Sequence, residues 1–253
     1  HGVAPWSHAA LSGWILDPDR KKMSKSKGNV VTPMDLFDQY GTDAVRYWSA
    51  SGRPGVDTAY SEDQMKVGRK LANKLLNVTK FVLTFPAADA AIPLAEAVTD
   101  PIDLSMLAKL DEVIAAATAG FDAFDYARAL DRTESFFWWF CDNYVELVKG
   151  RAYNSHGLEA ANSALRALRE ALGSVQRLLA PMIPFTTEEA WSWWNTASVH
   201  GAAWPRPGQL TGDASLIDPV IDTLAHVRRA KTEAKRSQKA PVERLVITAP
   251  AAL

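Results

Sequence analysis

Residues 61–86, which read SEDQMKVGRKLANKLLNVTKFVLTFP, decide the fold class of this chain. Ser61 has the chemistry of a helix N-cap, and Gln64 stands where a capping box places its reciprocal partner. Pro86 ends the pattern. Between them, apolar residues recur at helical spacing: Val67, Leu71, Leu75, Val78 and Val82. This stretch predicts a long amphipathic helix, and the fold is predicted to be mainly α.

The same spacing continues toward the C-terminus after an Ala/Pro-rich linker at residues 86–102. It predicts helices at about 107–117, 122–152, 158–179, 186–194 and 219–237. In the fourth of these, Thr186 and its neighbours are interpreted as the cap. Residues 242–248 are predicted to form a lone strand, which needs partners to be stable.

Before residue 61 the pattern is mixed. A short strand is predicted at 12–16 and a turn follows at 17–19. Thr32 is a predicted N-cap, with Pro33 at the first helical position and Gly41 just past the helix end. This order is typical of the end of an α/β domain. Three parts are therefore expected, at residues 1–60, 61–239 and 240–253.

Composition excludes several classes of protein. The formal net charge of -1 over 253 residues excludes a surface that is basic throughout, so any nucleic-acid contact must be local. The single cysteine, Cys141, excludes internal disulfides and indicates a reducing compartment, predicted to be the cytoplasm. Within its aromatic run Cys141 is interpreted as a small core residue. No apolar run reaches transmembrane length, so no membrane partner is expected, and no metal site is predicted.

The basic segment at residues 22–29 carries the clearest chemical signal. It reads Lys22-Met23-Ser24-Lys25-Ser26-Lys27-Gly28-Asn29. Lysines supply point charges for phosphate oxygens, serines add small donors, and a glycine permits a left-handed turn. A mobile loop that grips a polyphosphate is one interpretation. A solvated basic turn is the other, and composition alone favours it.

The string Lys-Met-Ser-Lys-Ser resembles the second signature of the class I aminoacyl-tRNA synthetases. In that family the loop closes over ATP while pyrophosphate leaves. The resemblance implies catalytic roles for Lys22 and Lys25 at the phosphates, with Lys25 the more important. It also implies that Ser24 and Ser26 shape and anchor the loop and that Met23 lies near the adenine. ATP with Mg²⁺ would be the substrate.

The resemblance covers nearly the whole chain. Residues 28–33 and 40–48 are similar to the segment after the loop in valyl, isoleucyl and leucyl enzymes, and residues 137–149 and 179–191 to their anticodon-binding bundle. Residues 11–19 and 228–235 resemble the valyl enzymes most, whereas Ser-Val-His at 198–200 is shared with isoleucyl enzymes. The implied fold is the end of a Rossmann-type catalytic domain, an α-helical anticodon-binding bundle and a short terminal β segment.

The resemblance also implies a function. The family's first signature, His-X-Gly-His, is absent, so we expect the C-terminal portion of a synthetase that is inactive by itself. The intact enzyme would attach valine to its tRNA, with ATP, valine and a valine-specific tRNA as partners, and it would be a monomer. Two alternatives stay open: an isoleucyl enzyme, and a non-catalytic tRNA-binding module that keeps the loop as a relic.

Candidate tRNA contacts lie in the basic segment after residue 227. Arg228, Lys231 and Lys235 share one face if the helix continues that far, and phosphate contact and a solvated face are equally favoured there. Lys149 and Arg151 are weaker candidates. Arg46 is instead expected to be buried, in an ion pair with Asp43 or an acidic helix end.

The aromatic residues are interpreted mainly as core. Tyr144 and the run at residues 136–140 stand mostly at core spacing. Trp191, Trp193 and Trp194 cannot all point inward from one helix, so one of them is expected at a partly exposed seam.

Overall fold

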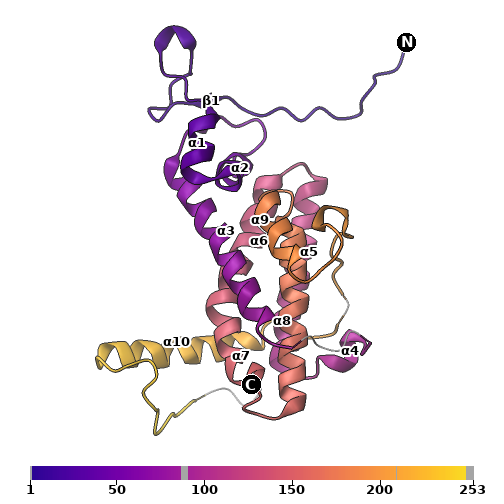
Figure 1. The fold of residues 1–253 in the computed structure, drawn as a ribbon, viewed down its shortest axis with the longest axis vertical. Coiled ribbons are helices and arrows are strands. Elements are labelled where there is room, and N and C mark those ends of the chain that lie inside the picture. The colour runs from indigo at the N-terminus through magenta and orange to yellow at the C-terminus, as the bar shows by residue number, and fades with distance from the viewer. Residues whose placement is uncertain (1, 87–90, 209, 249–253) are drawn as a thin grey trace.

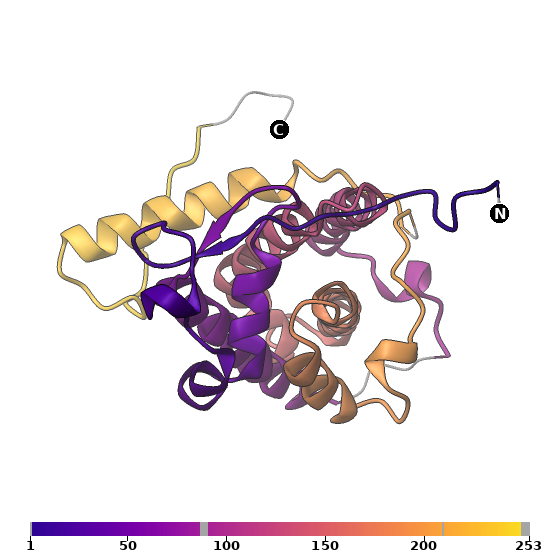
Figure 2. The same ribbon diagram turned by 90° about the horizontal axis from the view of Figure 1, so that it is seen from above.

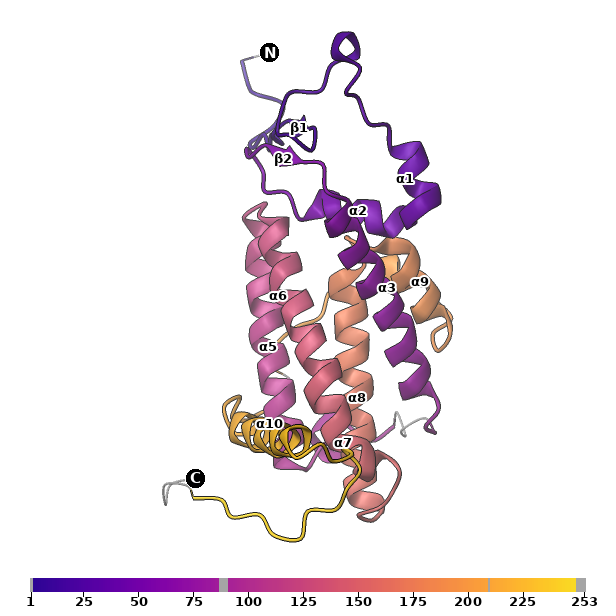
Figure 3. The same ribbon diagram turned by 90° about the vertical axis from the view of Figure 1, so that its left-hand side faces the viewer.

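The computed structural model describes residues 2–86, 91–208 and 210–248. These residues form an upright bundle of long helices with a smaller part at one end, here called the head and comprising residues 11–60 (Figure 1). Helix α10 (Ile217–Glu233) lies at the opposite end (Figure 3). A view down the bundle shows the long helices end-on, with α10 running across them (Figure 2).

The head contains a minimal sheet and two short helices. Strands β1 (Ile15–Leu16) and β2 (Thr58–Ala59) pair in parallel, with Ile15 opposite Thr58. The predicted strand at 12–16 is therefore shorter than expected, and Ser12 adds only an isolated bridge. The two segments approach so closely at Gly13 that a Cβ there would lie 2.2 Å from a backbone carbon of Val56.

Helices α1 (Pro33–Tyr40) and α2 (Thr42–Ala50) follow the basic loop. Thr32 and Pro33 stand at the predicted N-cap and first helical positions, although the Thr32 side chain makes no capping bond. Gly41 joins the helices with φ 90, a conformation that favours glycine. The predicted helix boundary at Tyr40 is confirmed.

The bundle is built from the long helices that the apolar spacing predicted. They are α3 (Glu62–Leu83), α5 (Pro101–Asp122), α6 (Tyr126–Trp139), α7 (Val145–Ala152) and α8 (Leu158–Leu179). Ser61 caps α3 by accepting a hydrogen bond from the Gln64 N–H. A π turn at Phe140–Tyr144 joins α6 to α7, so the helix predicted over 122–152 is one continuous but irregular rod that begins later, at Tyr126. None of the described helices is long and apolar enough to cross a membrane.

Shorter elements complete the fold, and some differ from the prediction. Helix α4 (Leu94–Ala97) lies inside the predicted linker, of which residues 87–90 lie outside the described residues. Helix α9 (Pro184–Ser192) begins at its proline, so Thr186 lies inside the helix and does not cap it. Short 3-10 turns occur at Lys25–Lys27 and Val199–Gly201.

The C-terminal region departs most from the prediction. Residues 242–248 form no strand, because no neighbouring strand among the described residues offers hydrogen bonds to them. The last helix ends at Glu233, earlier than predicted. The chain there turns back: Lys235 adopts φ 52, and the Arg236 N–H donates to the Lys231 carbonyl at 2.8 Å. Such a bond closes a helix end.

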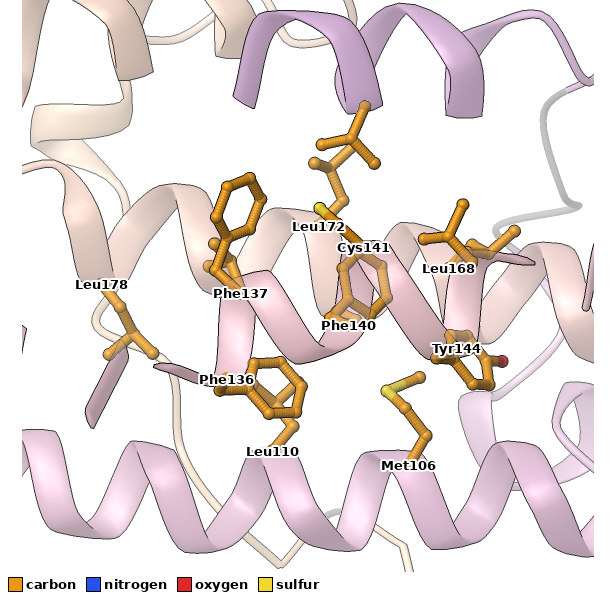
Figure 4. Packing of buried hydrophobic residues seen from close by; sticks show 14 of the residues in the cluster. Met106, Leu110, Phe136, Phe137, Phe140, Cys141, Tyr144, Leu168, Leu172 and Leu178 are labelled. Carbon is orange, nitrogen blue, oxygen red and sulfur yellow. The ribbon is translucent and has the colours of Figure 1, made fainter. Parts of the chain in front are cut away.

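The core is aromatic along α6 and the π turn (Figure 4). The rings of Phe136, Phe140 and Tyr144 stack in succession, with centroids 6.1 and 5.7 Å apart. Phe137 is fully buried on the same rod, so the core interpretation of this run is confirmed. Cys141 is buried beside these rings, as predicted, and its burial raises the pKa of the thiol to about 12.

A fully buried carboxylate, that of Asp103, ties the bundle helices together. It accepts hydrogen bonds from the Tyr144 hydroxyl at 2.7 Å and the Ser163 hydroxyl at 2.7 Å. Both terminal guanidinium nitrogens of Arg151 donate to it, at 2.8 and 2.6 Å. The network therefore links α5, the π turn, α7 and α8, and it leaves the buried charge fully paired.

Replacement of Asp103 by Asn should strongly destabilise the chain. The asparagine side chain would keep the shape but remove the charge that faces Arg151, so the largely buried guanidinium would keep only Asp100 as a charged partner. Removing one partner from a buried ion pair costs up to about 3 to 5 kcal/mol. Urea unfolding followed by circular dichroism measures the loss. Asp222→Asn, at an exposed site on α10, is the control and should change the free energy of unfolding by less than about 0.5 kcal/mol. Equal stability of the two variants would contradict the role of the network.

Candidate functional site

The base of the basic loop is closed by Asp17 and Asn29. The Asn29 amide nitrogen donates to Asp17 Oδ2 at 2.8 Å, and its oxygen accepts from the Ser24 N–H at 2.9 Å. Asp17 is buried, and its Oδ1 accepts from the Lys21 N–H at 2.7 Å. The pKa of this carboxyl group is lowered, mainly by the hydrogen bond from the Lys21 N–H and next by the one from Asn29. We call the pair formed by Asp17 and Asn29 the clasp.

Above the clasp the loop presents its cations to solvent. Lys25, Ser26 and Lys27 form an exposed 3-10 turn, and Gly28 ends it in the left-handed conformation that the sequence indicated, with φ 67. Neither lysine makes an ion pair within the described part of the chain. Figures 1 and 3 show the loop projecting from the head, away from the bundle. This geometry leaves both ammonium groups available to an anionic ligand.

The remaining predicted loop residues lie around that turn. Lys22 Nζ stands 4.4 Å from the centroid of the Trp14 ring, a cation–π contact. The hydroxyls of Ser24 and Ser26 are 3.3 Å apart, and Met23 is partly exposed. The main anchor is Asn29, for which no role was predicted. Its position directly after the left-handed glycine was the signal. The contacts of Lys22–Ser26 with ATP stay a prediction.

The basic segment near α10 does not form the continuous face that was predicted. Arg228 and Lys231 lie on the helix, but the left-handed turn takes Lys235 off it. The amide of Gln238 donates to the Arg228 carbonyl at 3.2 Å, and Lys231 Nζ donates to the Gln238 carbonyl at 3.0 Å. The chain after α10 thus folds back on the helix. Of the three predicted residues, only Arg228 and Lys231 lie on one helix at the spacing that was predicted to place them on a shared face.

The weaker tRNA candidates have different outcomes. Arg151 has little surface left for tRNA, because its side chain is only 14% exposed and its guanidinium is paired with Asp100 and Asp103. Its contact with tRNA stays a prediction that these pairs disfavour. Lys149 is accessible. It pairs with Glu146, and its ammonium lies 5.4 Å from the Phe81 ring centroid.

A groove beside Lys149 was missed by the sequence analysis. It encloses about 310 Å³ between α3 and the rod of the π turn and α7, and Lys74, Asn77 and Phe81 line its α3 side. Lys74 pairs with Asp142 at 2.9 Å. A groove that combines lysines with an accessible aromatic ring suits a nucleic-acid base and its phosphate. The spacing of 74, 77 and 81 on one helix face was the available signal.

Arg46 also differs from its prediction. It is exposed and makes no ion pair with Asp43; instead its Nη2 donates to the Pro181 carbonyl at 2.9 Å. Asp43 accepts from backbone N–H groups of α9. Both residues therefore connect the head to the bundle.

All three tryptophans near α9 are partly exposed, whereas one was predicted to be. Lys80 Nζ lies 5.5 Å from the ring centroid of Trp193, and Trp193 Nε1 donates to Glu189. Trp191 and Trp194 face each other edge to face. No group of three or more His, Cys, Asp or Glu side chains among the described residues is arranged to hold a metal ion.

Residues 103–247 match the family model described as the anticodon-binding domain of tRNA ligase, and this match covers more than half of the chain. The chain belongs to this family. Residues 1–61 match a second family model, that of the class I tRNA synthetases for I, L, M and V. The resemblance drawn from the loop and the bundle segments is confirmed. The anticodon-binding domain corresponds to α5 and the later helices, and the second match covers the head.

Two relatives of this chain are valine–tRNA ligases. Valine–tRNA ligase from Salinispora arenicola (strain CNS-205) is 55% identical over 96% of the chain and 31% of the relative. Valine–tRNA ligase from Thermobifida fusca (strain YX) is 54% identical over 98% of the chain and 28% of the relative. The chain thus spans about a third or less of the length of these relatives.

A solved structure supports the fold. LeuRS of Agrobacterium radiobacter K84, crystallised as a ternary complex with tRNA and LeuAMS, aligns over 78% of this chain and 24% of its own, with a TM-score of 0.60 at 21% identity. The predicted fold class, mainly α with the end of a class I catalytic domain before an anticodon-binding bundle, is confirmed.

Replacement of Asn29 by Ala should loosen the loop and leave the bundle intact. The Ser24 amide would have no acceptor, so its hydrogen exchange should become about five- to tenfold faster, as expected for a bond worth about 1 kcal/mol. Asn73→Ala, at an exposed site on α3, is the matched control. Hydrogen exchange measured by NMR tests this, and unchanged exchange at Ser24 would show that the clasp does not hold the loop.

Proposed function

We propose that this chain is part of a valine–tRNA ligase and supplies its ATP-closing loop and its anticodon-binding domain. The observation that carries the proposal is the 55% identity to a valine–tRNA ligase across 96% of the chain, loop included. The relatives described above are all valine–tRNA ligases, which favours valine over isoleucine as the amino acid. We further propose that the intact enzyme is cytoplasmic and monomeric.

The loop would act on the leaving end of ATP, which enters as a substrate with Mg²⁺. Lys25 and Lys22 would approach the phosphates as valine attacks and negative charge accumulates on pyrophosphate. Cations that meet this charge mainly in the transition state accelerate the step selectively. The clasp supports this role, because it holds the loop's base while the exposed turn at Lys25–Lys27 stays free. Met23 would lie near the adenine.

The bundle would bind tRNA through local features, since the net charge of -1 offers no general attraction. The groove between α3 and α7 is lined by the Phe81 ring, with Lys149 Nζ 5.4 Å from its centroid, and by Lys74. Each of these lysines is also paired with an acidic residue. Arg228 and Lys231 supply a second basic site on α10. We propose base stacking in the groove and phosphate contact at α10.

In the intact ligase, Lys25→Ala should slow valyl-adenylate formation by about 10²-fold, because the substitution removes one preorganised cation from the transition state. The affinity for valine should change little, since the contact forms mainly as charge develops. Pre-steady-state adenylate formation measures the rate.

Lys27→Ala is the control for this change, because Lys27 lies on the same exposed turn outside the predicted phosphate contacts. It should reduce the rate much less. A Lys25→Ala enzyme with an undiminished rate would mean that the loop is a surface turn. The 253-residue chain alone should show no valine-dependent ATP–pyrophosphate exchange.

The chain alone should bind valine tRNA weakly and with strong salt dependence. Replacing both Arg228 and Lys231 by Ala should weaken binding and flatten the log–log salt slope by about 0.7–0.9 for each phosphate interaction that the substitutions remove. Fluorescence anisotropy across a salt series measures both quantities.

A charge-preserving swap, Arg228→Lys with Lys231→Arg, is the matched control and should keep the wild-type slope. If the double alanine variant also keeps that slope, the α10 site is a solvated face and the tRNA binds elsewhere on the bundle.

A further inference from the structure

The carboxylate of Asp43 lies where the head meets the bundle. Asp43 belongs to the first turn of α2 and is only 7% exposed. Its Oδ2 accepts a hydrogen bond from the Thr186 N–H at 2.6 Å, and its Oδ1 accepts one from the Phe185 N–H at 3.3 Å. A side chain of the head therefore binds the first turn of a bundle helix that follows it by 143 residues.

Helix α9 has no cap of its own. Its N-cap position is Ile183, whose side chain cannot accept a hydrogen bond, and Pro184 follows at the first helical position. The N–H groups of a first helical turn have no partner inside the helix. A carboxylate satisfies them and also interacts favourably with the helix dipole. Asp43 thus supplies the N-cap acceptor that the residues just before α9 do not provide, although it lies far away in the sequence.

Two further side chains of α2 reach the bundle. Arg46 donates to the Pro181 carbonyl, in the same corner between α8 and α9. On the other side the Tyr47 hydroxyl donates to Glu134 Oε2 of α6 at 2.5 Å. Burial and the nearby Glu134 raise the pKa of Tyr47, so it stays a donor. Helix α2 is therefore held against two bundle elements at once.

The contacts between α2 and the bundle also bear on the lysine loop, because the loop leads into α1 and α2. After Gly28 the chain enters α1 almost directly, and only Gly41 separates α1 from α2. We propose that Asp43 is a positioning residue: its bonds to Phe185 and Thr186 fix the orientation of the lysine loop relative to the bundle. The inference rests on the proposed function, in which the bundle binds tRNA and the loop closes over the ATP that activates valine.

A positioning role of Asp43 and a purely stabilising role have different consequences for the two reactions of the enzyme. A cap that only stabilises α9 would raise the free energy of unfolding, and its removal would leave each reaction of the folded enzyme unchanged. A positioning contact would affect the step that needs tRNA and active site together, the transfer of valine to the tRNA 3′ end. Adenylate formation without tRNA needs no such alignment.

The test uses Asp43→Asn in the intact ligase. Asparagine keeps the shape but removes the charge and one acceptor. Valine-dependent ATP–pyrophosphate exchange without tRNA and the Kd for tRNA should stay within about twofold of wild type. The kcat of tRNA charging should fall about five- to tenfold, because the loop and the bundle-bound tRNA would no longer be held in one relative orientation. Asp38→Asn is the matched control on α1, because that side chain is exposed and makes no hydrogen bond within the described residues.

A second variant, Arg46→Gln, removes the exposed bond to Pro181 and leaves the α9 cap in place. It should show the same split with a smaller loss, and it decides the question if Asp43→Asn does not fold. Unchanged charging by both folded variants, or an equal loss in both reactions, would overturn the inference. A wild-type ligase inactive in both assays would instead contradict the proposed function.

Discussion

The bundle depends on the buried charge of Asp103. Long amphipathic helices could pack in several relative rotations, because apolar contact alone is not directional. Asp103 restricts that choice, since Arg151, Tyr144 and Ser163 must all reach one carboxylate from separate segments. The π turn contributes to this geometry, because Tyr144 is its last residue. The network thus fixes how α5, the π turn, α7 and α8 lie relative to one another. The groove and the head both pack on these bundle helices or their neighbours.

Sequence reasoning predicted the elements that depend on local periodicity. Helix α8 begins and ends at the predicted residues, and α1 ends at Tyr40 before the predicted glycine. It failed where distant partners decide the outcome. Helix α9 begins before Thr186 because its cap comes from Asp43 in the head. Residues 242–248 have the composition of a strand, but pairing is a property of two segments.

The candidate site shows the same division. The loop's composition and its resemblance predicted a phosphate-binding role for Lys22–Ser26, because the residues that carry this signal are consecutive in the sequence. That role stays a prediction. The roles of Asp17 and Asn29 required knowledge of which parts of the chain meet. The ion pair of Arg151 was also not predictable, because a basic residue at a helix end is indistinguishable in sequence from one that neutralises a buried acid. Lys235 leaves the predicted face because it adopts a left-handed conformation. The sequence has no glycine there that would have indicated such a turn.

The clasp has a consequence for how strongly the loop can act. With Asp17 and Asn29 joined, the chain between them is a small closed ring, and its lysines explore only the volume that this ring allows. A tethered group over so short a span has an effective concentration in roughly the millimolar range near a ligand at the head. Weak individual contacts would then suffice for frequent encounter. They would also break quickly, so a loop held in this way suits a ligand that is bound and released repeatedly.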